Sequence, residues 1–237
     1  MRSIRILLLL AFSALFSVSA SAGTAYPVLV TVDRAGGIAY GSVVDARGPN
    51  TYLQCMLESG AIACDAKDRY GVEAHCSLDP ATNPAFAKNV LAINNASFVA
   101  FYWNPATGTC TDMRLINGSQ FLQAPPAGDR PDAFRVDMQQ DDDGRLFVYG
   151  GVSSARYFDD NPLEFISCDV WANGYIYCVA RDHNGSAASC HTTEGANPSF
   201  AERARSIDSA AFVRFELDPS TQVCGEIAVW KGSRYLP

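Results

Sequence analysis

The chain has 237 residues, of which 18 are Lys or Arg and 25 are Asp or Glu, so its formal net charge is −7 at neutral pH. An acidic chain with scattered bases is a poor electrostatic partner for phosphate groups, and we expect no binding to nucleic acid or to anionic membrane surfaces. The length suffices for one large domain or for two domains of about 100 residues each.

The first 22 residues have the pattern of a secretory signal peptide. Arg2 and Arg5 provide a basic start, an apolar run extends from 6 to 18, and Ala20 and Ala22 form an Ala-x-Ala cleavage pattern. The apolar run is shorter than the roughly 20 residues that span a bilayer, and no later stretch is long and apolar enough to do so. The sequence therefore predicts a secreted or periplasmic protein with a signal peptide at residues 1–22 and no membrane anchor.

All eight cysteines lie after this segment, and an even number of cysteines in an exported chain is typical of disulfides. Zinc binding is the alternative. However, the spacings include no Cys-x-x-Cys pair and the chain has only three histidines, so we expect no metal and no other cofactor. The predicted disulfide cysteines are Cys55, Cys64, Cys76, Cys110, Cys168, Cys178, Cys190 and Cys224.

The cysteines also mark an internal repeat. The first four are separated by 9, 12 and 34 residues, and the last four by 10, 12 and 34. A shift of 114 residues carries Cys76 onto Cys190, and from there 16 of 47 positions are identical without a gap. The sequence predicts two homologous modules in tandem, residues 23–123 and 133–237, joined by a Pro- and Gly-containing linker at 124–132.

Each module is expected to contain a cysteine-bearing β-hairpin. In the second module Asn173-Gly174 is a turn signal between two β-rich runs, and the first module has Ser59-Gly60 there. A second turn, at 68–71 or 182–185, leads into a third strand. Because side chains alternate along a strand, each cysteine should share a core face with residues two positions away. These sets are Leu53/Cys55/Leu57, Ile62/Cys64/Ala66, Ile166/Cys168/Val170 and Ile176/Cys178/Ala180.

A short helix comes next in each module. Asn83 and Asn197 are favourable N-caps, and each is followed by a proline, which is tolerated at the first helical position. Two further strands follow each helix, so the predicted fold class is α+β. Each module would be an antiparallel sheet, a meander plus a hairpin, with one short helix and disulfide staples. The apolar stripes that should pack each helix onto its sheet are Phe86/Val90/Ile93 and Phe200/Ala204/Ile207.

Alternation places one cysteine opposite another across each hairpin. The predicted bridges are Cys55–Cys64, Cys76–Cys110, Cys168–Cys178 and Cys190–Cys224. The alternative is Cys64–Cys76 with Cys55–Cys110, because the middle strand also faces the third. We further expect every strand to pair within its own module, so that residues 133–237 fold alone.

The sequence contains none of the common hydrolase or phosphate-binding motifs. His183 follows Asp182, but both fall in a predicted turn, where a solvated role is more common. Around the acidic run Asp141–Asp143, the residues Gln139, Asp141 and Asp143 alternate before a glycine as in a calcium loop. The closing carboxylate of such a loop is missing, however, which favours a hairpin turn. A small secreted hydrolase with its site between the modules, around His183 or His191, is the alternative function.

The most informative difference between the modules is aromatic. On the face opposite the cysteines the second module has Tyr175 and Tyr177, with Trp171 near the turn, where the first has Ala61 and Ala63. A core face could not absorb that change in volume, so the rings should lie at the surface. Packing against the first module or the acidic hairpin is the alternative. We interpret the rings as the site of a secreted, non-catalytic binding protein. Its ligand would be a carbohydrate or a secreted protein, including an enzyme that it inhibits.

Overall fold

The computed structural model describes residues 28–43, 50–58, 60–122, 135–153, 155, 164–192 and 197–231. The predicted signal peptide at 1–22, the linker at 124–132 and Ser59 lie outside these ranges. Over the described residues the protein is mostly β-sheet with two short α-helices and four disulfides, which agrees with an α+β-like, disulfide-stabilised fold.

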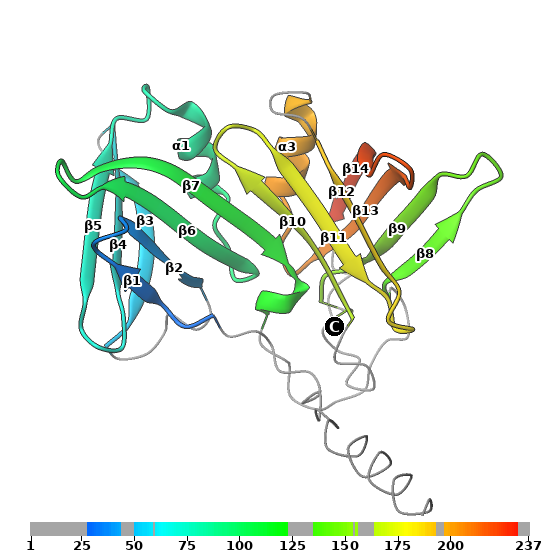
Figure 1. Cartoon of the computed structure of the whole chain (residues 1–237), viewed down its shortest axis with the longest axis horizontal. Helices are drawn as coiled ribbons and strands as arrows, with labels where there is room; N and C mark the ends of the chain where they lie inside the picture. The colour runs from blue at the N-terminus through cyan, green and yellow to red at the C-terminus, as the bar shows by residue number, and fades with distance from the viewer. Residues whose placement is uncertain are drawn as a thin grey trace, which may run out of the picture.

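In the first half, two short strands precede a three-stranded meander, and a helix and a long two-stranded hairpin follow (Figure 1). A short 3-10 turn, η2, ends the half. The elements are β1 (Thr31–Asp33), β2 (Ile38–Ser42), β3 (Tyr52–Glu58), β4 (Ala61–Lys67), β5 (Glu73–Leu78), α1 (Pro84–Leu91), β6 (Ser97–Asn104), β7 (Thr109–Gly118) and η2 (Ser119–Phe121).

The second half has the same order of strands and helix. Its elements are β8 (Asp137–Gln140), β9 (Leu146–Gly151), β10 (Phe165–Trp171), β11 (Ile176–Arg181), β12 (Ala187–His191), α3 (Pro198–Arg205), β13 (Ala211–Asp218) and β14 (Val223–Lys231).

All the described strands belong to one sheet, because β7 of the first half pairs antiparallel with β10 of the second. Figure 1 shows the two strands side by side at the centre of the molecule, with α1 and α3 adjacent on one side of it. The expectation that every strand pairs within its own half is therefore wrong. Independent folding of residues 133–237 stays a prediction, and such a fragment would leave the outer edge of β10 unpaired.

The described strands pair antiparallel except at two places. Ser77 of β5 bridges Thr109 of β7 in parallel, and His191 of β12 bridges Val223 of β14 in the same way. Each half also has a register shift within its long hairpin, after Tyr102 in the first and after Glu216 in the second. The β5–β7 and β12–β14 bridges close each meander onto its hairpin.

The predicted caps begin both helices. The side-chain oxygen of Asn83 accepts a hydrogen bond from the backbone N–H of Phe86, and that of Asn197 accepts one from Ser199. Proline follows each cap, where its missing N–H costs no helical hydrogen bond. Phe86 and Val90 of α1 are buried, as are the stripe residues Phe200, Ala204 and Ile207 of the second half, so the stripes face the sheet as predicted.

The four predicted disulfides form, and the alternative pairing does not. Their face of the sheet is the core face, with most of the predicted neighbours fully buried. One residue departs from the prediction. Leu57 is exposed whereas Val170, at the matching place beside Cys168, is buried, because β10 has a second neighbouring strand, β7, and β3 has none among the described strands. Alternation fixes the direction of a side chain but not whether anything covers it.

The turns follow their sequence signals. Asp68 and Asp182 each accept two backbone N–H groups through one carboxylate oxygen, which closes the turn before the third strand of each meander. Residues 141–144 form the hairpin turn between β8 and β9, where Asp141 accepts the N–H of Arg145 and Gly144 has a positive φ of 82°. The acidic run is thus a turn, as expected.

The disulfides that close the longest loops should contribute most to the free energy of unfolding. Cys190 and Cys224 are separated by 34 positions in the sequence, and Cys168 and Cys178 by 10. Replacing Cys190 and Cys224 with alanine should lower the free energy of unfolding by about 3–4 kcal/mol, and replacing Cys168 and Cys178 by about 2–3 kcal/mol, because the longer loop loses more chain entropy on closure. Denaturant unfolding of the two double variants measures the difference, and a larger loss for the shorter loop would contradict this ranking.

Candidate functional site

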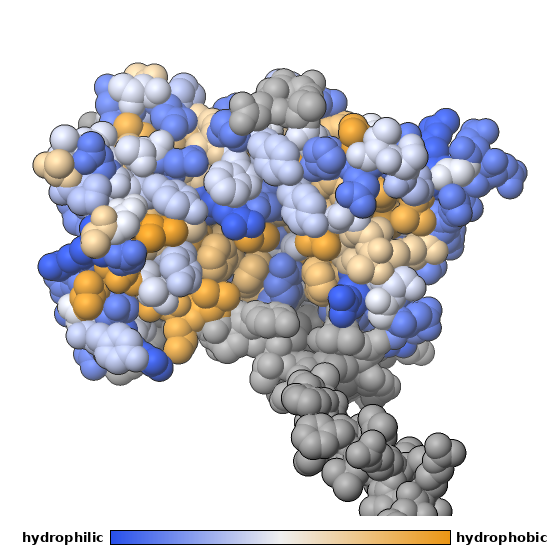
Figure 2. All heavy atoms as spheres, viewed as in Figure 1, coloured by the Kyte–Doolittle hydropathy of each residue, from blue (hydrophilic) through white to orange (hydrophobic). Residues whose placement is uncertain are grey.

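The candidate site lies where β7 meets β10, on the sheet face opposite the disulfides. Five residue pairs join the strands, from Ser167 opposite Gly118 to Trp171 opposite Arg114. The approach is close at one end, since a Cβ at Gly118 would lie 2.2 Å from the Cβ of Ser167. In Figure 2 this region faces the viewer, and hydrophobic residues gather on it between polar ones. The junction therefore forms a continuous surface of hydrophobic and polar residues rather than a gap between the two halves.

Trp171 is held in the junction by polar neighbours. Its indole N–H donates to Asp169 Oδ2 at 3.2 Å, and the guanidinium of Arg114 lies 5.0 Å from the centre of its ring. Arg114 Nε donates to the same carboxylate oxygen at 2.6 Å. The ring is half-buried and stacked on the arginine of the other half, so part of its surface serves to join the halves.

The two tyrosines stand beside Trp171 on the same face. Tyr175 follows the β10–β11 turn, and its ring stacks on His191 with centroids 6.4 Å apart. Tyr177 lies opposite His191 across β11 and β12 and is 36% exposed. The structure thus brings the three predicted residues together and adds Arg114 and His191. Alternation along β12 could have placed His191 on this face, but no sequence signal pairs Arg114 with Trp171.

Asp169 is the buried charge of the site. Burial raises the pKa of this carboxyl above its usual range, against the hydrogen bond and charge of Arg114 and the hydrogen bond from Trp171. Its second oxygen, Oδ1, is buried without a hydrogen-bond partner among the described residues. The site therefore combines aromatic rings, an arginine and a carboxylate with one oxygen left unsatisfied.

The opposite face of the junction carries the two helices. Asn89 of α1 donates to the backbone oxygens of Met113 and Val170, so it bridges β7 and β10, and it accepts from Arg205 of α3 at 2.6 Å. Lys88 and Glu202 pair across the helices at 2.6 Å. Pockets of about 450 and 390 Å³ flank this ion pair, and neither is lined by a histidine. A hydrolase site between the halves around His183 or His191 finds no support in these linings.

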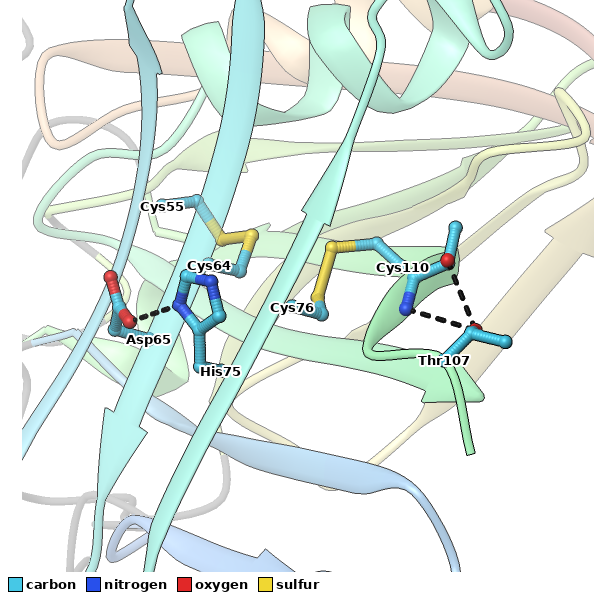
Figure 3. The surroundings of a disulfide bond; sticks show 8 residues. Cys55, Cys64, Asp65, His75, Cys76, Thr107 and Cys110 are labelled. Atoms are coloured by element: carbon cyan, nitrogen blue, oxygen red, sulfur yellow. Dashed lines mark hydrogen bonds and ion pairs between the residues drawn. A yellow bond between two sulfur atoms is a disulfide. The ribbon is translucent and has the colours of Figure 1, made fainter. Parts of the chain in front are cut away.

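A histidine–carboxylate pair lies elsewhere, in the first half. His75 Nδ1 is 2.7 Å from Asp65 Oδ1 across β4 and β5, next to the disulfides (Figure 3). Together with Arg34, Tyr52 and Trp103 these residues line a pocket of about 390 Å³, whose lining includes no serine, threonine or cysteine. Sequence reasoning missed the pair, although alternation places both side chains opposite the cysteines. By contrast, the Asp182 carboxylate beside His183 is used to close its turn.

Within the described ranges there is no group of three or more histidine, cysteine, aspartate or glutamate side chains that could hold a metal ion. Neither described α-helix, each of eight residues, is long and apolar enough to cross a membrane. No protein family, no curated protein and no solved structure matches the chain.

The buried Asp169 should leave a pH signature on stability. Because its pKa is raised in the folded state, the stabilisation it contributes is present below its unfolded pKa, about pH 4, and is lost as pH rises through its folded pKa. Asp169→Asn keeps a neutral side chain and abolishes this titration. The free energy of unfolding of the wild type minus that of Asp169→Asn should therefore fall as the pH rises from about pH 4 through the raised folded pKa.

Asp218→Asn is the control for this comparison. The hydrogen bond from Ser220 lowers the pKa of Asp218, so its wild-type-minus-variant difference should rise with pH below about pH 4 and stay level above it, where the difference for Asp169 falls. Denaturant unfolding at several pH values measures both slopes. If the wild-type-minus-variant difference for Asp169→Asn rises with pH instead, the interaction with Arg114 lowers the pKa of Asp169 by more than burial raises it.

Proposed function

We propose that the chain is an exported, non-catalytic binding protein built from two copies of one module, with its ligand on the outer face of β10–β12. Support for two copies comes from matched details of pairing. The parallel bridge of each half and the register shift of each long hairpin fall at positions 114 residues apart, the same shift that aligns the sequences. The boundaries at 23–123 and 133–237 belong to this proposal.

The unequal outer faces of the two copies carry the functional proposal. Ala61 and Ala63 of β4 occupy the face on which the second copy presents Tyr175 and Tyr177. Neither alanine is buried, so the first copy folds without rings at these two positions. Rings that the scaffold does not need are available for a ligand, and they bury contact area at low entropic cost.

A carbohydrate is the ligand class that this surface fits best. A planar ring face bordered by hydrogen-bonding groups can stack on the apolar face of a sugar while the borders bind its hydroxyls. The strip defined by Trp171, Tyr175 and Tyr177 has Arg114 and His191 at its borders, and Arg114 is held in place by the carboxylate of Asp169. A secreted protein, including an enzyme to be inhibited, is the other class that such a strip could bind.

Removing both tyrosines should weaken binding strongly without unfolding the protein. Tyr175→Ala with Tyr177→Ala should weaken binding by about thirtyfold, since anchoring aromatic residues commonly contribute about 2 kcal/mol or more. The melting temperature should change little, because alanine occupies both places in the first copy. Binding is measured by isothermal titration with oligosaccharides selected on a glycan array.

Two further variants complete this test. Tyr70→Ala removes the most exposed tyrosine among the described residues and should leave affinity unchanged. Trp171→Ala should lower stability as well as affinity, because its ring also contacts Arg114 and Asp169 across the junction. Full affinity in the double tyrosine variant would place the site elsewhere, and capture of a secreted protein without any glycan signal would assign the other ligand class.

A hydrolase is the second candidate function, and the His75–Asp65 pair is the observation that favours it. A histidine oriented by a carboxylate can act as a general base toward water. If the pocket is catalytic, His75→Ala should abolish hydrolysis of a panel of chromogenic ester and glycoside substrates while the melting temperature is unchanged. Equal rates for the wild type and the variant, or no hydrolysis by either, would exclude this candidate.

A further inference from the structure

The edge of β3 in the first half and the edge of β14 in the second half lack a partner among the described residues. β3 pairs only with β4, although its counterpart β10 also pairs with β7. The last residues of β14, Ala228–Lys231, pair only with β13, although the corresponding end of β7 also pairs with β10. Open edges of this kind are templates for pairing with another chain, and monomeric proteins usually block them with proline, bulges or charges.

The residues on these edges are apolar and exposed where their counterparts are covered. Counting from the disulfide cysteines, Met56 and Leu57 of β3 correspond to Asp169 and Val170 of β10. Met56 and Leu57 are 40% and 41% exposed, whereas Asp169 and Val170 are 3% and 1% exposed. On the other edge, the shift of 114 residues carries Ile116 of β7 onto Trp230 of β14. Trp230 is 43% exposed, whereas Ile116 is half-buried in the junction.

We propose that a second copy of this chain docks head to tail on the first, with the β3 edge of one copy paired to the β14 edge of the other. The internal β7–β10 junction provides the register, given that the two halves are copies of one module. Asp169 lies opposite Ile116 there, and Val170 lies opposite Leu115. The docked copy therefore places its Met56 opposite Trp230 and its Leu57 opposite Val229.

The helices support the same arrangement. In the junction, Asn89 donates to the backbone oxygens of Met113 and Val170. Arg203, its counterpart on α3, already donates to Ile227 at 2.7 Å, which matches the bond to Met113. Its remaining N–H groups are positioned for the backbone oxygen of Leu57 in the docked copy. The exposed Leu91 of α1 takes the place that the buried Arg205 occupies in the junction, so docking also covers this leucine.

The charged residues on the helices of the two docked copies are complementary as well. Lys88 and Glu202 occupy equivalent positions on α1 and α3 and form an ion pair across the junction. A docked copy brings its own Lys88 toward Glu202 of the first. The contact uses a different surface on each copy, so it is heterologous and builds either a ring or a chain of copies.

The test uses one blocked edge per variant. Met56→Glu introduces a charge on the β3 edge, and Trp230→Glu introduces one on the β14 edge. Each variant alone should be monomeric by sedimentation velocity, at concentrations where the wild type forms larger species. Because each variant keeps one intact edge, an equimolar mixture of the two should form a discrete heterodimer. Tyr70→Glu, at an exposed tyrosine away from both edges, should assemble like the wild type.

Melting curves of each variant confirm that it is folded, and Met56→Lys with Trp230→Lys serve as replacements if a glutamate variant unfolds. A wild type that stays monomeric at every concentration would overturn the proposal. So would assembly that the substitutions leave unchanged, or a mixture of the two variants that stays monomeric.

Discussion

Five residue pairs between β7 and β10 hold the two halves of this protein in one sheet, and most of the other observations depend on this junction. It buries β10 on both edges and brings Arg114 onto Trp171 and Asp169. It also sets α1 beside α3, where Asn89 satisfies backbone oxygens of both strands. The cores themselves remain largely separate. One apolar cluster lies within residues 30–115, and the other draws almost all its members from 136–227.

The junction explains why Trp171 differs from the tyrosines beside it. A tryptophan that stacks on an arginine and donates to a buried carboxylate is part of the scaffold, whereas Tyr175 and Tyr177 contribute a surface that the first half lacks. The same contacts orient the strip, because Trp171, Tyr175 and the turn between them are fixed by the end of β10. A rigid platform loses little conformational entropy when a ligand binds, which suits a binding site.

Local signals in the sequence predicted much of the fold. The helix caps at Asn83 and Asn197, the turns at Asp68 and Asp182, and the disulfides across each hairpin all depend on residues close in sequence or on simple alternation. The rings at 175 and 177 were found because the sequences of the two halves could be aligned and compared at these positions. Each of these features is decided by contacts within a few residues or within one hairpin.

The remaining features depend on contacts between distant segments. Nothing in residues 109–118 or 165–171 states that these strands pair, since any exposed edge offers the same backbone groups. The burial of Val170 and the exposure of Leu57 follow from that pairing, so alternation alone predicted both as core. The His75–Asp65 pair required knowing which strands are neighbours. The glycine at position 118 is a sequence signal that another strand approaches closely, because any larger residue there would collide with Ser167 of β10.

Native-state hydrogen exchange of the full chain tests most directly whether the junction unites the halves. The backbone amides of β7 and β10 that pair across the junction should be as strongly protected as those of β11 and β13, because they open only when a core opens. If these junction amides exchange through a low-energy opening while both cores stay protected, the halves are independent domains and the junction does not determine the structure.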